Sequence, residues 1–117
     1  MVLAGKRILV IEDEFLVAAM LCDFIEDEGA LPVGPFGRVD EGLAAIAEGC
    51  FDAAVLDWNL AGDPSVPLAH ALAEMSVPFV IATGYGQVEE PFDDRPLLAK
   101  PYAADDVIAA LKRIFGA

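Results

Sequence analysis

Short apolar runs in this chain are followed by acidic residues. Glu12 and Asp13 follow the run Ile8 to Ile11, and Asp57 follows the run Ala53 to Leu56. A continuous apolar run of four residues is typical of a strand that is covered on both faces. Carboxylates that follow such strands leave the core at the edge where open α/β sheets bind their ligands. These three carboxylates are therefore candidate site residues.

Two other polar residues occupy equivalent positions, since Thr83 follows the apolar run 79–82 and Lys100 follows the run 97–99. Three carboxylates at one edge repel one another unless a cation shares the site, and such oxygen ligands favour a hard cation such as Mg²⁺. With the ion bound, Asp57 could attack phosphorus and become an aspartyl phosphate. Lys100 would pair with Asp57 and the phosphate, and Thr83 would donate its hydroxyl to a phosphate oxygen.

The elements that must position these residues alternate along the chain. Helices are expected near 15–28, 39–49 and 66–75, with a last amphipathic helix near 105–115, and strands near 8–11, 31–33, 53–56, 79–82 and 97–99. Such alternation with short connections predicts an α/β fold of the flavodoxin-like, doubly wound kind. We expect a five-stranded parallel sheet in the order 2-1-3-4-5, which brings the candidate site residues together at the switch point.

Two segments depart from this regular pattern. Pro32 and Pro35 flank the second strand and favour a sheet edge for it. The segment 87–95 contains Pro91, four acids and little helical periodicity, so we expect a fourth helix there to be short or mobile.

Composition limits the classes of function. The 117 residues leave room for one domain, 1–117, and their hydrophobic content of 56% is enough for a core. The net charge of −13 argues against direct binding to nucleic acid or an anionic membrane surface. Cys22 and Cys50 have neither metal-binding nor disulfide spacing, and no apolar stretch is long enough for a signal peptide or a membrane span. We expect a cytoplasmic protein with reduced thiols.

The chain resembles the receiver domain of response regulators in two-component signalling, and the residues that carry the resemblance are Glu12-Asp13, Asp57, Thr83 and Lys100-Pro101. The resemblance covers nearly the whole chain. It implies that Asp57 is the phosphoacceptor and that Glu12 and Asp13 are the metal-binding acid pair. It also implies that Asp57 and the backbone carbonyl of Asn59 complete the Mg²⁺ coordination.

The same resemblance implies that Thr83 is the switch hydroxyl, that Lys100 is the phosphate-pairing lysine, and that the peptide bond between Lys100 and Pro101 is cis. Receivers typically have an aromatic residue three positions before this lysine, and here that position is Leu97. The usual coupling between the threonine and an aromatic ring is therefore not expected.

The stretch 79–86 resembles that of an alphaproteobacterial subgroup of receivers with a Phe-Ala-Thr-Gly type signature, in which the fourth helix is short or mobile. In this stretch Tyr85, two residues after Thr83, would either pack on the surface or shield the site from water. Trp58 directly follows Asp57 and is expected to face away from it in a packing role.

The resemblance implies a signalling protein rather than an enzyme, one that catalyses only its own phosphorylation and dephosphorylation. The phosphoryl donor would be a sensor histidine kinase or a phosphotransfer protein, since His70 is expected on a helix away from the site. Readout would go through a downstream protein or a fused output domain, and the short fourth helix favours a monomer.

Two alternatives remain. A phosphohydrolase of the haloacid dehalogenase type also forms an aspartyl phosphate but has a second Asp two residues after the nucleophile, where this chain has Asn59. A degenerate receiver would bind partners without being phosphorylated.

Overall fold

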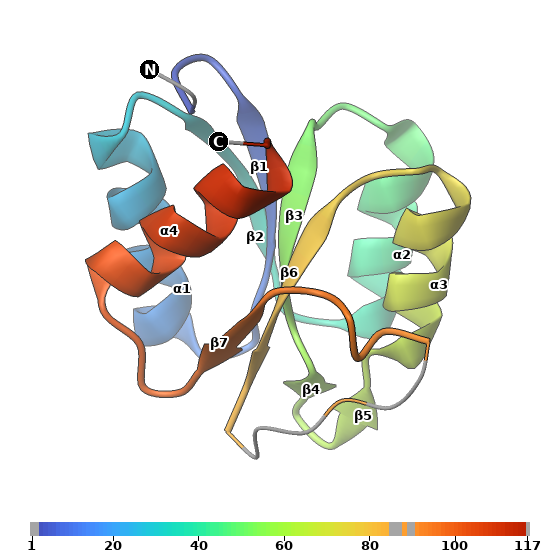
Figure 1. The fold of residues 1–117 in the computed structure, drawn as a ribbon. Coiled ribbons are helices and arrows are strands. Elements are labelled where there is room, and N and C mark those ends of the chain that lie inside the picture. Colours follow the sequence, from blue (N-terminus) through green and yellow to red (C-terminus); the bar gives the residue numbers. More distant parts are fainter. Residues whose placement is uncertain (1–2, 85–87, 89–90, 117) are drawn as a thin grey trace.

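The computed structural model describes residues 3–84, 88 and 91–116. Its main sheet has five parallel strands in the order β2-β1-β3-β6-β7 (Figure 1). The strands are β1 (Arg7–Ile11), β2 (Leu31–Phe36), β3 (Ala53–Asp57), β6 (Phe79–Thr83) and β7 (Leu97–Ala99). This is the flavodoxin-like order that the alternation of elements predicts, so that prediction is confirmed.

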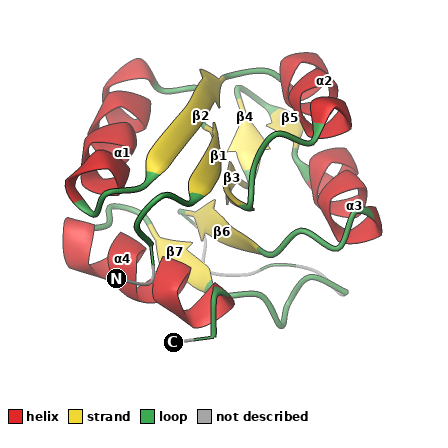
Figure 2. Ribbon diagram, turned by 90° about the horizontal axis from the view of Figure 1, so that it is seen from above, coloured by secondary structure: helices red, strands yellow, loops and turns green. Residues whose placement is uncertain are grey.

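Two helices cover each face of the sheet, as the view along it shows (Figure 2). The helices α1 (Phe15–Asp27) and α4 (Ala104–Ile114) lie on one face, and α2 (Val39–Glu48) and α3 (Val66–Glu74) lie on the other. Neighbouring residues of a strand therefore enter different cores. Ile8 and Val10 pack with α1 and α4, whereas Leu9 and Ile11 pack with α2 and α3. All five residues of β3 are buried, as the apolar run predicts.

The second strand lies at an edge of the sheet, in agreement with its prolines, but it continues to Phe36 and is longer than expected. Pro35 follows a cis peptide bond after Gly34, which has a φ of 109°. A side chain at Gly34 would meet the Val10 carbonyl oxygen at 2.9 Å. Glycine therefore lets the edge strand stay close to β1 through its irregular middle.

The connection between β6 and β7 has no helix among its described residues, 84, 88 and 91–96. The expectation of a short or mobile fourth helix agrees with this arrangement, while Tyr85, for which two roles were open, lies outside the described residues. Phe92 is nevertheless buried, with 3% of its surface exposed, and packs into the core beneath α2 and α3. The Phe92 side chain thus anchors this connection in the hydrophobic core.

A short hairpin follows β3 and is not among the elements expected from the sequence. The strands β4 (Asn59–Leu60) and β5 (Asp63–Pro64) pair antiparallel around Ala61 and Gly62, both of which have positive φ. No helix among the described residues is both long and apolar enough to span a membrane.

Candidate functional site

Three strands of the main sheet end side by side in buried polar residues. Asp57 is the last residue of β3 and Thr83 the last of β6, and Asp57 is paired in register with Ala82, the neighbour of Thr83. Glu12 directly follows β1, where its N–H donates to the Phe36 carbonyl at 2.9 Å. The side chains of all three residues are in the small set of buried polar groups, and each residue is 4% exposed.

Lys100 joins this group from the end of β7. Its N–H donates to the Thr83 carbonyl at 3.0 Å, which continues the pairing of β7 with β6 past the strand. Its ammonium nitrogen Nζ lies 3.0 Å from Asp57 Oδ1 and 3.1 Å from Glu12 Oε1. The peptide bond between Lys100 and Pro101 is cis, as the resemblance to receivers implies.

The carboxylates of Glu12, Asp13 and Asp57 form an acidic cluster in which one oxygen from each lies within 4.8 Å of the others. Asp13 is exposed, whereas the other two acids are buried. All the donors are carboxylate oxygens, which suit Mg²⁺ and similar hard cations better than softer metals. The residues present therefore fit a Mg²⁺ ion, held by these three acids.

The charge state of Asp57 depends on this crowding. Burial is the largest of the effects that together raise its pKa to about 7; the neighbouring Glu12 also raises this pKa, while the hydrogen bond and positive charge of Lys100 lower it. Burial by itself would lower the pKa of Lys100, but the two acids outweigh it and the pKa is raised. Lys100 is thus held as an ammonium, and Asp57 changes charge near neutral pH in the absence of a metal ion.

Asp13 and Asp57 line a cleft of about 670 Å³ that admits a ligand from solvent. Thr83, Trp58 and Asn59 line this cleft together with Asp57 and Lys100. The Asn59 N–H donates to Asp57 Oδ1 at 3.4 Å, and its side-chain oxygen accepts the Gly62 N–H at 2.8 Å. The Asn59 side chain therefore closes the hairpin turn.

Ser65 supports the site, although it is not among the site residues that the sequence predicts. Its buried hydroxyl donates to the Asp57 carbonyl oxygen, and its N–H donates to the Trp58 carbonyl at 3.2 Å. These two hydrogen bonds tie the end of β3 to the start of α3. A serine eight residues after the acid carries no sequence signal for this contact, because it depends on the path of the β4–β5 hairpin.

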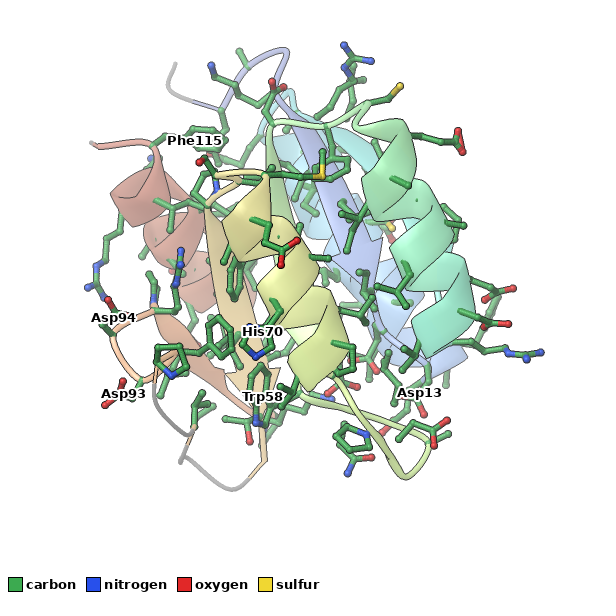
Figure 3. The ribbon with its side chains drawn as sticks, turned by 90° about the vertical axis from the view of Figure 1, so that its right-hand side faces the viewer. Asp13, Trp58, His70, Asp93, Asp94 and Phe115 are labelled. Atoms are coloured by element: carbon green, nitrogen blue, oxygen red, sulfur yellow. The ribbon has the colours of Figure 1, made fainter. Side chains whose placement is uncertain are left out.

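Trp58 packs against an aromatic ring, as its position predicts, but it also lines the cleft with Asp57 and so does not face wholly away from the acid. Its ring lies 6.1 Å from the ring of Phe92, and Phe92 also contacts His70 on α3 at 4.9 Å and Phe79 on β6 at 6.0 Å. Figure 3 shows Trp58 beside His70 and at the same edge of the molecule as Asp13. Phe92 thus connects the residue after Asp57 with α3 and with the connection between β6 and β7.

The structure brings the predicted residues to one edge, namely Glu12, Asp13, Asp57, Thr83 and Lys100, with Asn59 beside them in the cleft. Their chemical roles stay predictions. Leu97, at the position where receivers typically have an aromatic residue, is 40% exposed on β7.

Comparison with known proteins gives relatives over almost the whole chain. No protein-family model matches it. The phosphate regulon transcriptional regulatory protein PhoB of Escherichia coli is 28% identical over 121 residues, which cover 94% of this chain and 52% of PhoB. The chain thus spans about half the length of the curated relatives it matches.

This chain is also similar to several solved structures. SdrG from Sphingomonas melonis is 44% identical, with a TM-score of 0.85 and coverage of 97% of this chain and 98% of SdrG. The BeF3-activated conformation of SdrG matches with 45% identity, a TM-score of 0.81 and coverage of 96% and 98%. The response regulator PhyR from Brucella abortus is 26% identical, with a TM-score of 0.82, and the match covers 96% of this chain and 48% of PhyR.

Proposed function

Because this chain belongs to the receiver-domain family of response regulators, we propose that it is a phosphorylation switch whose phosphoacceptor is Asp57. The single observation that carries this proposal is the placement of the Asp57 carboxylate. It is buried at the end of a central strand, paired with Lys100 at 3.0 Å, clustered with two other acids, and open to a cleft. The phosphoryl group would come from a sensor histidine kinase or a phosphotransfer protein.

Asp57 performs the bond-forming step. One of its carboxylate oxygens attacks the phosphorus atom of the donor, and the bond from phosphorus to the donor's leaving atom breaks. The acid must be ionised to attack, and the Lys100 ammonium beside it favours that form. A bound Mg²⁺ ion, held by Glu12, Asp13, Asp57 and the backbone carbonyl of Asn59, would supply positive charge that offsets the acids and the phosphoryl oxygens.

Lys100 and Thr83 hold the product. The three N–H donors of the ammonium can bind Asp57 and a phosphoryl oxygen together, which compensates negative charge added to a buried site. Thr83 lines the same cleft from the end of β6, and its hydroxyl would donate to another phosphoryl oxygen. The backbone hydrogen bond between Lys100 and Thr83, at 3.0 Å, holds together the two backbone segments from which these side chains extend.

A phosphohydrolase of the haloacid dehalogenase type is the second candidate function. Its general acid would stand at Asn59, which has no acidic group and whose side chain already closes the turn to Gly62. We therefore favour a protein that acts only on itself, through its own phosphorylation and dephosphorylation, over an enzyme with turnover. A degenerate receiver is disfavoured because Asp13, Asp57, Thr83 and Lys100 line one cleft, and Glu12 completes the acidic cluster beside it.

Signalling would proceed through protein contacts, either with a separate target or with an output domain on the same polypeptide. The charge of −13 opposes direct contact with nucleic acid and with anionic membrane surfaces. We propose a cytoplasmic protein of the alphaproteobacterial subgroup. We propose that it is monomeric. Many receivers dimerise through a surface that includes the fourth helix, and the described residues of the β6–β7 connection form no helix.

The proposal is tested by incubating the protein with Mg²⁺ and acetyl phosphate and separating the phosphorylated form on a phosphate-affinity gel. We expect a retarded band for the wild type and for the control variant Asp23→Asn, which changes an exposed acid on α1. The Asp57→Asn variant is expected to give no such band. Retardation of Asp57→Asn equal to that of the wild type would refute Asp57 as the acceptor.

A further inference from the structure

The hydroxyl group of Tyr102 is buried and has no hydrogen-bond partner among the described residues. The residue is 8% exposed and lies between Pro101 and the start of α4. Burial of a hydroxyl donor without an acceptor costs free energy that phenylalanine, with the same ring, avoids. The hydroxyl at this position therefore suggests an acceptor in another state of the protein.

Tyr102 is not among the residues that line the cleft of Asp57. A second cavity, of about 280 Å³, is lined by Glu14, Val17, Met20, Lys100, Pro101 and Tyr102. Lys100 and Glu14 line both this cavity and the cleft that contains Asp57. Movement of the lysine side chain would therefore alter a cavity that Tyr102 also lines.

Glu12 is one of the two acids that pair with the lysine. Its side chain is 2% exposed, and its two oxygens have different partners. Oε2 accepts the Glu14 N–H at 3.1 Å, whereas Oε1 lies 3.1 Å from the Lys100 ammonium in an ion pair and, like the Tyr102 hydroxyl, has no hydrogen-bond partner among the described residues. Glu12 also acts electrostatically on the Tyr102 hydroxyl. The pKa of Tyr102 is raised to about 12, mainly by burial and next by the negative charge of Glu12.

A phosphoryl group on Asp57 would compete with Glu12 for the lysine. The ammonium now lies almost equally far from Asp57 Oδ1 and Glu12 Oε1, at 3.0 Å and 3.1 Å. New anionic oxygens beside Asp57 would draw it towards the cleft. Glu12 Oε1, which already lacks a hydrogen-bond donor, would then also lose the one cationic side chain that it contacts among the described residues, which is a costly arrangement for a buried carboxylate.

We propose that Tyr102 is a positioning residue whose hydroxyl donates a hydrogen bond to Glu12 Oε1 when Lys100 turns to a phosphoryl group on Asp57. The inference rests on the proposed function. In it, the hydroxyl replaces the lysine at Glu12, keeps the acid oriented in the cluster, and so stabilises the phosphorylated state relative to the free protein.

The first test uses Tyr102→Phe, which removes only the hydroxyl. Affinity for beryllofluoride in the presence of Mg²⁺ is measured by the fluorescence of Trp58, the single tryptophan. A hydrogen bond to a charged group is worth about tenfold or more in binding, so we expect the variant to bind about tenfold more weakly. The midpoint of thermal unfolding without ligand should be unchanged or raised, whereas a purely structural role would lower it.

A matched background separates the hydrogen bond from other effects of the substitution. In Glu12→Gln the acceptor is no longer charged, so adding Tyr102→Phe should weaken beryllofluoride binding by less than about threefold. Equal losses in the two backgrounds would overturn the inference, as would wild-type affinity in Tyr102→Phe alone.

The hydroxyl can also be observed directly by NMR with tyrosine labelled at Cζ, and Tyr102→Phe assigns the signal. We expect beryllofluoride to shift this signal in the wild type and not in Glu12→Gln. No shift in the wild type, despite bound beryllofluoride, would refute the inference and leave the proposed function intact. If the wild type fails to bind beryllofluoride at all, both the inference and the proposed function fail.

Discussion

The Lys100 ammonium lies 3.0 Å from Asp57 Oδ1, although the two residues come from strands that are not neighbours. The strand β6 separates β3 from β7, so the lysine side chain reaches across the end of β6 to meet the acid. Glu12 approaches the same ammonium from β1. The pair is thus assembled at the sheet edge from elements far apart in sequence, and its charge balance is sensitive to anything that binds there.

Asp57→Asn is expected to raise the free energy of unfolding of the metal-free protein, and this increase should be larger at higher pH. The pKa of Asp57 is about 7 in the folded protein against an ordinary value of 3.8, so the protonated acid favours folding. This contribution is complete below the unfolded pKa and is lost as pH rises through the folded pKa. Urea unfolding at about pH 5 and pH 8 measures it. We expect the difference in the free energy of unfolding between Asp57→Asn and the wild type to be larger at pH 8 than at pH 5 by at least about 1 kcal/mol. Equal differences at the two pH values would contradict the account.

Asp13→Asn is expected to weaken Mg²⁺ binding at least about tenfold, because it removes one charged oxygen ligand of the three. Asp13 is exposed, so stability without metal should change by less than about 0.5 kcal/mol. Titration of Mg²⁺ by calorimetry checks the affinity, and Asp23→Asn on α1 serves as the control of equal charge. If both variants bind Mg²⁺ equally well, the acidic cluster does not hold the ion.

Lys100→Met is expected to destabilise the protein by about 2 kcal/mol near pH 8, because Glu12 and Asp57 lose their common cation in a buried site. The loss should shrink near pH 5, where the raised pKa of Asp57 allows it to become neutral. Unfolding of the double variant Lys100→Met with Asp57→Asn checks the cause. If the second substitution fails to restore stability, the lysine acts by something other than charge pairing.

Phe92→Ala is expected to cost about 3 kcal/mol, since it opens a cavity among Trp58, His70 and Phe79. Trp58 emission should shift to longer wavelength as water reaches the indole. Met75→Ala, at a residue 44% exposed, is the control and should change stability by less than about 0.5 kcal/mol. A loss below about 1 kcal/mol for Phe92→Ala would mean that the β6–β7 connection is not anchored by this ring.

Much of the fold and the site could be predicted because the relevant signals are local. Each central strand is a bare apolar run, and parallel strands leave their terminal residues at one edge. Asp57, Thr83 and Lys100 follow directly from that rule. The edge position of β2 follows from its prolines, whose missing N–H groups suit a strand with one free side.

The remaining contacts depend on paths that the sequence does not encode locally. Ser65 reaches the Asp57 carbonyl only because the β4–β5 hairpin folds back, and Phe92 is buried within a segment of acids and proline that has no helical period. The Tyr102 hydroxyl has no sequence signal either, because a tyrosine and a phenylalanine fit the same core position. Such contacts follow from tertiary packing, which overrides local composition.

The central claim is that Asp57 itself becomes an aspartyl phosphate, and reductive trapping tests it most directly. The protein is incubated with Mg²⁺ and acetyl phosphate and then treated with borohydride, which reduces an acyl phosphate to an alcohol and so converts aspartyl phosphate to homoserine. Peptide mass spectrometry then locates the change. We predict homoserine at position 57 and at no other acid. Homoserine at another position, or its absence from a sample that carries phosphate, would contradict the account.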